Sequence, residues 1–480
     1  MLFNSYEFIF LFFPITFLVY FLLAKSYLKQ ISRIWLVIAS IFFYAYWKWE
    51  YLYLLIGSIL FNYFIGIHLS KNYNQKLKLK ILILGILFNL FLLGYYKYYD
   101  FFIKNINFIF SLELPLLNLV LPLGISFFTF QQIAYLVDSY KRETKEYNFF
   151  DYALFVSFFP QLIAGPIVHH KEIIPQFNSK ENLRINYKNI SLGLFIFSIG
   201  LFKKVILADT IGTLADAGYS NPKNIQFIDA WLVSFAFVFQ IYYDFSGYSE
   251  MAVGLGKIFN IDILWNFDSP FKTSNIQDLW RKWHISLSRF LKDYVYIPLG
   301  GSKVSEGRNY INLMITFTVG GIWHGAAWTF FIWGFLTGIG ILIHKLWSKK
   351  FHLPDPIAIP INFIYFVLGS VFFRANSIDD SIEILKGMFG INGLILPKFL
   401  QFLNLDFPYK EYGSEFFPKL HTDIFAYLLI GMTFAFIGKN TKEMSENFKP
   451  NFFYGFLTFL FFTYSVMNLL SVTKFLYFNF

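Results

Sequence analysis

Long apolar runs recur along the whole chain and are separated by short polar segments. The first run extends from Phe8 to Ala24. Later runs lie near residues 150–168, 189–207, 228–245, 310–327, 328–348, 357–375, 420–438 and 451–475. A helix that crosses the hydrocarbon core needs about 20 predominantly apolar residues. The pattern therefore predicts an all-α polytopic membrane protein with roughly 11 to 13 membrane-embedded helices.

Several of these runs contain residues that break helices. Pro122 and Gly124 interrupt one run, and Pro160, Gly165 and Pro166 interrupt another. Backbone that is broken at membrane depth is tolerated only where it is buried in protein or lines a wet cavity. We therefore expect re-entrant segments around a central funnel. The mixed stretch 377–423 is expected at the interface, and the absence of repeats and linkers predicts a single domain over residues 1–480.

The distribution of basic residues predicts the orientation in the membrane. The formal net charge is +10, and the cations cluster in short loops such as Lys25–Arg33, Lys71–Lys80 and Lys141–Lys145. Positive charge in alternate loops marks the cytoplasmic side, so the N-terminus is expected outside. The first run has no basic stretch before it and no cleavage site after it, which indicates a retained helix. This explanation leaves no reason to expect nucleic-acid binding.

Composition narrows the chemistry further. Charged residues make up 15% of the chain, against about 25% in soluble domains, so no sizeable soluble domain is expected. The chain contains no cysteine. Thiolate metal sites and a thioester on the protein itself are therefore excluded, and any acyl relay has to use oxygen or nitrogen.

One histidine, His324, lies within an apolar run. If the helix is continuous, Gly321 and Trp328 share its face, and Gly321 and Gly325 have the GxxxG spacing of close helix packing. The imidazole is then expected to point into the protein. One interpretation is a general base that removes a proton from a hydroxyl attacking a carbonyl. The alternative is a structural histidine that hydrogen-bonds to a neighbouring helix.

A second candidate region lies at residues 276–290. Read as one helix, it places Trp280, Trp283, His284 and Leu287 on one face. The cations nearby are Arg281, Lys282, Arg289, Lys292 and Lys303. Together with Trp280 and Trp283, these cations predict an entry site for a phosphate-bearing donor, with a plain interfacial anchor as the alternative. His284 and His324 lack a third ligand at metal-binding spacing, so no metal is expected.

Several motifs occur in order along the chain. The central ones are Asp278–His284, Asp293–Gly301 and Gly320–Gly325. Further motifs are Leu121–Gln131, Phe159–Pro166, Tyr242–Ser249 and Phe373–Ala375. With these motifs, the stretch Asn266–Trp333 resembles the signature region of the membrane-bound O-acyltransferase (MBOAT) superfamily, and in particular its alginate and peptidoglycan O-acetyltransferase branch. We take residues 266–333 as the catalytic region.

The resemblance implies a fold, a reaction and a location. The fold is a ring of helices around a tunnel that joins a cytoplasmic donor side to an external acceptor side. His324 corresponds to the catalytic histidine and His284 to a second functional one. The implied donor substrate is acetyl-CoA or an acyl carrier protein, with no bound cofactor. The implied location is the bacterial inner (cytoplasmic) membrane.

The segment 475–480 resembles the tail of a small partner peptide in the related D-alanylation system. In that motif a tyrosine carries the acyl group, and the matching residue here is Tyr477. The alternative is an aromatic interfacial anchor. A relay through Tyr477 would hand acetyl to a periplasmic or extracellular SGNH-type O-acetyltransferase partner. The residue usage, heavy in Lys, Asn, Ile and Phe, indicates an AT-rich genome rather than that of a typical alginate producer. On this ground peptidoglycan is the first choice of final acceptor and an alginate-like exopolysaccharide the second.

Three other interpretations stay open on sequence. A transporter or flippase for envelope precursors would also need broken helices and a cavity. A non-catalytic scaffold for an envelope enzyme would tolerate replacement of both histidines and Tyr477. A D-alanyl or longer-chain acyltransferase would differ from an acetyltransferase in the depth of its pocket.

Overall fold

The structure is a computed structural model that describes residues 1–25, 29–71, 73–144, 147–398, 401, 408–410, 423–469 and 476. Within these residues the chain is overwhelmingly α-helical, which confirms the predicted all-α class. Two short β-strands, β1 (Leu396–Pro397) and β2 (Tyr409–Lys410), pair in parallel.

The chain forms two compact units, each assembled from three stretches of sequence. Unit 1 comprises Met1–Leu201, Tyr248–Trp265 and Asn447–Leu470. Unit 2 comprises Phe202–Gly247, Asn266–Glu446 and Ser471–Phe480. The predicted catalytic region 266–333 falls entirely within unit 2, whose second stretch begins at Asn266. The prediction of one domain over the whole chain stays a prediction.

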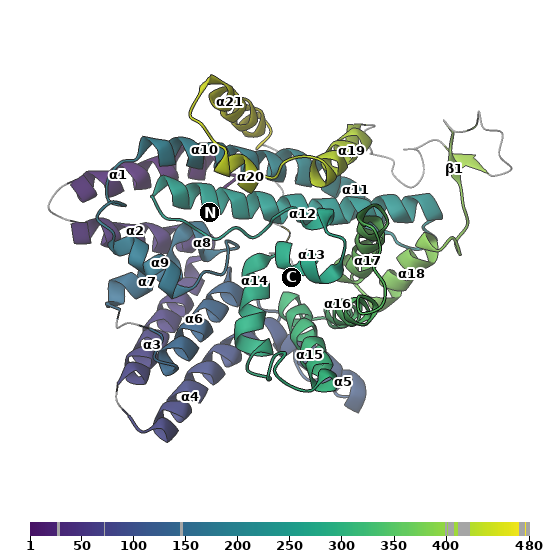
Figure 1. Cartoon of the computed structure of the whole chain (residues 1–480). Helices are drawn as coiled ribbons and strands as arrows, with labels where there is room; N and C mark the ends of the chain where they lie inside the picture. Colours follow the sequence, from purple (N-terminus) through teal and green to yellow (C-terminus); the bar gives the residue numbers. More distant parts are fainter. Residues whose placement is uncertain are drawn as a thin grey trace. The chain divides into compact units, whose positions relative to one another are not determined.

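Unit 1 contains helices that are long enough to cross a membrane and others that are shorter (Figure 1). Its elements are η1 (Phe8–Phe12), α1 (Phe13–Lys25), α2 (Lys29–Ala45), η2 (Trp49–Tyr51), α3 (Leu52–Ser70), α4 (Gln75–Leu93), η3 (Gly94–Tyr98), α5 (Tyr99–Phe110), α6 (Ile125–Tyr140), α7 (Phe149–Ser157), α8 (Phe159–Leu162), α9 (His170–Asn178), α10 (Tyr187–Phe202) and α21 (Phe452–Met467).

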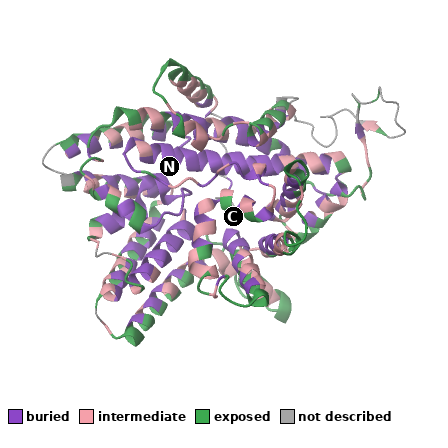
Figure 2. Cartoon of the chain, in the orientation of Figure 1, coloured by how far each residue is buried: buried purple, intermediate pink, exposed green. Residues whose placement is uncertain are grey.

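The centre of unit 1 is α6, which packs against α3 and α4 (Figure 1). Almost every residue of α6 is buried (Figure 2). Glycines allow the close approach, because a Cβ on Gly85 would meet the Leu136 side chain at 2.5 Å. The helix begins directly after Gly124, whose φ of +68° is a conformation that favours glycine.

The predicted breakers lie where the helices of unit 1 end. Pro160 stands in the first turn of the short helix α8, and the backbone leaves helical geometry before Gly165 and Pro166. All residues from 151 to 170 are buried. The interrupted backbone is therefore covered by protein, as required at membrane depth.

Unit 2 contains the candidate catalytic residues. Its elements are η4 (Lys203–Ala208), α11 (Asp209–Ser220), the first part of α12 (Phe227–Ile258), η5 (Pro270–Lys272), α13 (Ile276–Lys282), α14 (Ile285–Leu291), η6 (Lys292–Tyr296), α15 (Glu306–His324), α16 (Trp328–Trp347), α17 (Asp355–Arg374), α18 (Ile378–Met388), β1, β2, α19 (Asp423–Phe436) and α20 (Thr441–Glu446). The residues after position 247 in α12 belong to unit 1.

Six helical segments among the described residues have the length and apolar composition needed to cross a membrane. They are Phe8–Lys25, Trp49–Ser70, Gln75–Phe110, Tyr187–Ser220, Trp328–Trp347 and Asp355–Arg374. Shorter apolar helices lie at Gln30–Ala45, Ile424–Phe436 and Phe452–Met467. The protein is therefore a multi-pass membrane protein, while the predicted total of roughly 11 to 13 embedded helices stays a prediction.

The tightest helix pair of unit 2 is α15 with α16. A Cβ on Gly321 would meet the Phe330 carbonyl oxygen at 2.5 Å and the Gly334 Cα at 2.7 Å. The two backbones therefore approach with no side chain between them, as small residues permit in membrane proteins. This contact lies three residues from His324 and fixes the end of α15.

Replacement of Gly321 by valine should separate α15 from α16. We expect the free energy of unfolding to fall by about 1–3 kcal/mol, because the inserted side chain has to displace the backbone of the facing helix. The measurement is the thermal unfolding midpoint of the detergent-solubilised protein. Gly307→Ala is the matched control on the same helix, since a Cβ there meets nothing within 4 Å. Equal midpoints for the two variants would contradict this account of the packing.

Candidate active site

His324 is the last residue of α15, and this corrects one sequence prediction. The backbone turns extended at Gly325 (φ −159°, ψ 153°), and α16 begins only at Trp328. The predicted single helix through Trp328 is therefore wrong, and Gly321 and Gly325 do not form a GxxxG pair on one helix. A residue without a Cβ is needed at position 325, because the Phe330 ring occupies the space that a side chain would fill. His324 is nevertheless buried, as predicted, with 4% of its surface exposed.

The expected helix over residues 276–290 is also wrong, because it breaks at His284. Trp283 is extended, and His284 adopts a left-handed conformation (φ 46°, ψ 54°) that separates α13 from α14. This conformation costs a non-glycine residue about 1–2 kcal/mol. Asn266 supports the turn: its carbonyl oxygen accepts the Ile285 N–H at 3.0 Å, and its side-chain oxygen accepts the Ser286 N–H at 3.2 Å.

The break turns His284 fully into the protein, with 0% of its surface exposed. Its ring centroid lies 6.2 Å from that of His324. The two imidazoles, which are 40 positions apart in sequence, are thus brought together in the fold. Phe245 of α12 stacks edge-on against His284, with the ring centroids 4.6 Å apart.

Aromatic rings from three helices enclose His324. The ring centroids of Trp323 on α15, Trp333 on α16 and Phe373 on α17 lie 5.0, 5.2 and 5.1 Å from that of His324. All three meet the imidazole at steep angles, the edge-to-face geometry that aromatic pairs favour. This cage excludes bulk water from the imidazole.

The electrostatic consequence is clearest at His284, which lies between two seven-residue helices and outside the spanning segments. Burial lowers the pKa of His284 to about 3, because the protonated ring would lose its hydration. His284 is therefore neutral at physiological pH. A neutral imidazole can accept a proton at one nitrogen and donate one at the other.

A small cavity of about 10 Å³ adjoins His324. It is lined by Phe237, Ile241, Trp283, His324, Trp333, Phe366, Ser370 and Phe373. Its size is close to that of one water-sized probe. The space beside the imidazole is therefore narrow and predominantly aromatic.

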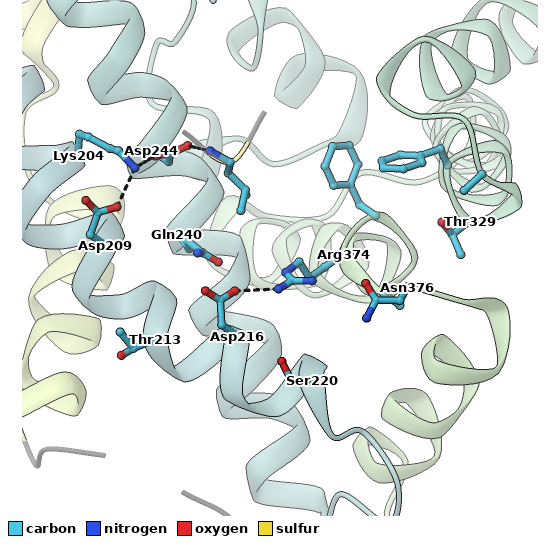
Figure 3. Close-up of a pocket in the computed structure, with 15 residues that line it drawn as sticks. Lys204, Asp209, Thr213, Asp216, Ser220, Gln240, Asp244, Thr329, Arg374 and Asn376 are labelled. Atoms are coloured by element: carbon cyan, nitrogen blue, oxygen red, sulfur yellow. Dashed lines mark hydrogen bonds and ion pairs between the residues drawn. The ribbon is translucent and has the colours of Figure 1, made fainter. Parts of the chain in front are cut away.

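A second cavity of about 740 Å³ lies in unit 2 and has a polar lining (Figure 3). Phe373 lines both this cavity and the small one at His324. Charged side chains face the large cavity, including Lys204, Asp209 and Asp244, and an ion pair of 2.8 Å joins Arg374 to Asp216. The polar cavity thus reaches the ring that covers His324.

Sequence reasoning assigned no role to most of these charged residues. Asp244 and Arg374 lie inside quoted motifs, but only as part of the resemblance, and Lys204 was not singled out. A signal was present, because Lys204 and Asp244 are ionisable residues within apolar runs. Such residues are functional candidates by default in a membrane protein.

The predicted donor-binding residues separate into two groups. Trp280 and Trp283 are buried, with Trp280 packed against Trp333 and Trp283 against Phe366. The cations Arg281 and Lys303 are exposed, and Lys282 and Arg289 are half-buried. The tryptophans therefore belong to the aromatic core beside His324, whereas the cations are accessible to solvent. Tyr477 lies outside the described residues.

The fold and the site together define a membrane-embedded protein with two buried imidazoles in a dry aromatic cage beside a polar cavity. Residues 41–376 match the family model of MBOAT, the membrane-bound O-acyltransferase family. The chain belongs to this family and is an acyltransferase.

Named relatives are similar over most of their length. A peptidoglycan O-acetyltransferase of Helicobacter pylori is 50% identical over 428 residues, covering 82% of this chain and 81% of the relative. A probable alginate O-acetylase AlgI of Pseudomonas aeruginosa is 38% identical over 399 residues, covering 81% and 75%. A teichoic acid D-alanyltransferase of Streptococcus thermophilus is 28% identical over 239 residues, covering 48% and 58%.

The buried state of His284 predicts how stability depends on pH. Between pH 6.5 and pH 3 the unfolded chain binds a proton at this residue and the folded chain does not. Stability is therefore lost as the pH falls through this window, by up to about 1.4 kcal/mol per pH unit. We expect the thermal unfolding midpoint of His284→Gln to fall less steeply than that of the wild type as the pH is lowered from 7 to 4.5.

His352→Gln is the control for this measurement, because His352 is exposed. Its midpoint should follow the wild-type curve. Parallel curves for the wild type and His284→Gln would contradict a neutral, buried His284.

Proposed function

We propose that this acyltransferase is a transmembrane O-acetyltransferase that takes acetyl from a cytoplasmic thioester and passes it across the membrane for O-acetylation of peptidoglycan. The observation that carries the proposal is the pair of buried imidazoles, 6.2 Å apart, inside an aromatic cage that shares Phe373 with a polar cavity. Acyl transfer from a thioester needs a base for the attacking hydroxyl and protection of the acyl group from water.

In the proposed step, the hydroxyl of Tyr477 attacks the thioester carbonyl carbon while His324 accepts its proton. A neutral N–H of His284 is a candidate donor to the oxygen on which negative charge develops. The intermediate collapses by breaking the carbon–sulfur bond. The departing thiolate takes the proton from His324, which leaves free CoA and acetyl-tyrosine.

The second step regenerates the tyrosine. A sugar hydroxyl attacks the ester carbonyl, the carbon–oxygen bond to Tyr477 breaks, and the proton of the sugar hydroxyl returns to the tyrosine oxygen. We assign this step to a periplasmic or extracellular SGNH-type partner, because no soluble sugar-binding domain was expected from the sequence.

The lining of the cavity at His324 favours an uncharged acyl group. Five aromatic side chains line it beside the imidazole, namely Phe237, Trp283, Trp333, Phe366 and Phe373. None of the lining residues is acidic, so the lining holds no carboxylate for the ammonium group of D-alanine. This feature supports acetyl over the D-alanyl alternative.

The donor is proposed to be acetyl-CoA, which approaches from the cytoplasm. The exposed cations Arg281 and Lys303 offer charge to its phosphates, with Lys282 and Arg289 nearby in sequence. A cytoplasmic donor side agrees with the predicted cytoplasmic position of the basic loops and with the predicted external N-terminus. We place the protein in the bacterial inner membrane.

Peptidoglycan is proposed as the acceptor because the relative from Helicobacter pylori, named a peptidoglycan O-acetyltransferase, is 50% identical over 82% of this chain. An alginate-like exopolysaccharide is the second candidate, supported by the 38% identity to a probable alginate O-acetylase. A transporter or flippase is less well supported, because export of a precursor does not require two buried imidazoles in an aromatic cage.

Radiolabelled acetyl-CoA tests the proposed chemistry directly. We expect stable label on the wild-type protein and none on His324→Ala or Tyr477→Phe. Release of CoA should fall by about 10²–10⁴-fold in His324→Ala, the range for loss of a general base. The measurements are label on the purified protein and the amount of free thiol.

Each pattern of results has a distinct meaning. CoA release that persists in Tyr477→Phe but not in His324→Ala would keep the acetyltransferase and remove the tyrosine relay. Thioester cleavage at the wild-type rate in His324→Ala would remove His324 as the base. Absence of cleavage in every form, with the partner supplied, would favour the transporter.

Reversal of charge at the exposed cations should weaken donor binding. We expect Arg281→Glu and Lys303→Glu each to raise the KM for acetyl-CoA about 3- to 10-fold at low salt with little change in kcat, because exposed charges are screened and contribute modestly. The increase in KM relative to the wild type should become smaller at high salt. Lys188→Glu, an exposed cation of unit 1, is the control and should leave KM unchanged.

A further inference from the structure

Three charged side chains form a compact cluster on one wall of the polar cavity (Figure 3). Lys204 Nζ lies 2.7 Å from Asp209 Oδ1 and 2.5 Å from Asp244 Oδ1. The side chains of Lys204 and Asp244 are 2% and 3% exposed, and that of Asp209 is 10% exposed. The cluster is therefore almost entirely withdrawn from water.

The backbone that carries Lys204 is unusual. η4 is a π-helical turn, in which the Asp209 N–H bonds to the Lys204 carbonyl five residues earlier. This wide turn brings the two side chains to the same side, so that they form the ion pair. π-Helical turns weaken a helix and are found frequently at functional sites.

The charges of the cluster do not cancel when all three groups are ionised. Two carboxylates surround one ammonium group, which leaves an excess of one negative charge in a buried place. Such an excess is costly unless further donors compensate it. A backbone N–H that points at one of the carboxylates is a donor of this kind.

The described residue Leu476 supplies that donor. Its backbone N–H bonds to Asp244 Oδ2 at 2.9 Å, and Leu476 is buried with 8% exposure and lines the same cavity. The bond joins positions 232 residues apart in sequence. Tyr477 follows Leu476 directly, so a fixed amide at 476 restricts where the tyrosine hydroxyl can reach.

We propose that Lys204, Asp209 and Asp244 are positioning residues that form a clamp for the backbone amide of Leu476. The ion pair with Lys204 orients Asp244, and Asp244 holds the Leu476 N–H in the polar cavity that Phe373 also lines. The inference rests on the proposed relay through Tyr477 for its role in the reaction. The grip itself is independent of that chemistry.

The absence of cysteine makes the clamp directly measurable. Leu476→Cys gives the chain a single thiol and preserves the backbone N–H that Asp244 binds. The readout is the rate at which a water-soluble maleimide reacts with this thiol in the full-length protein. We expect Asp244→Ala and Lys204→Met, each in the Leu476→Cys background, to react at least about tenfold faster, because a charge-assisted hydrogen bond is lost.

Matched variants separate the clamp from general loosening. Asp216→Asn removes a carboxylate that lines the same cavity but pairs with Arg374, and it should leave the labelling rate at position 476 unchanged. A single Thr213→Cys reporter on α11 should react equally fast with and without the Asp244 substitution. If Asp244→Ala does not fold, Asp244→Asn keeps the shape and removes the charge, and an increase of a few fold is expected.

An unchanged labelling rate at position 476 in Asp244→Asn and Lys204→Met would overturn the clamp. So would an equal acceleration at positions 476 and 213, which would mean that the cavity had loosened as a whole. Acceleration confined to position 476 supports it.

Acetyl transfer gives a second readout. With the native Leu476, Asp244→Asn should lower CoA release and label on Tyr477 together, each about tenfold, because the hydroxyl that attacks the thioester is no longer positioned. If the wild type carries no label on Tyr477 while position 476 still depends on Asp244, the proposed relay fails and the clamp stands.

Discussion

Removal of water from two imidazole rings is the condition on which the site depends. In water a histidine titrates near neutral pH and its charge is screened, but burial lowers the pKa of His284 to about 3 and keeps that ring neutral. The edge-to-face contacts of Trp323, Trp333 and Phe373 with His324 contribute about 0.5–1.5 kcal/mol each beyond area burial. The same contacts hold the ring in one orientation. The same aromatic side chains therefore stabilise the fold and orient the imidazole of His324.

The cage in turn depends on places where helices stop. α15 ends at His324, and the chain between α13 and α14 turns at His284, so both imidazoles stand at interruptions of the helical backbone. A residue at such an interruption can point along a direction that no regular helix offers. The hydrogen bonds from Asn266 and the glycine contact between α15 and α16 hold these interruptions in place.

Much of this arrangement could be predicted from the sequence, and the rest has physical reasons for being hidden. The apolar runs predicted the all-α membrane class, and the ionisable histidine in an apolar run pointed to the site. The breaks at His284 and Gly325 could not be predicted from helical periodicity. His284 carries no local signal for a left-handed conformation, since its support comes from Asn266, which lies 18 positions earlier. The partnership of Lys204, Asp244 and Leu476 joins three distant stretches and needs the fold itself.

Phe373 has one more consequence, which concerns leakage. The Phe373 ring lines both the polar cavity of about 740 Å³ and the space at the buried imidazole. In the proposed reaction, water that passed this ring would hydrolyse the thioester, and a chain of water molecules would offer protons a route toward the membrane interior. Under that proposal the ring has to move aside for an acyl group and still exclude water. Its size would then set how well acyl transfer is combined with preservation of the proton gradient.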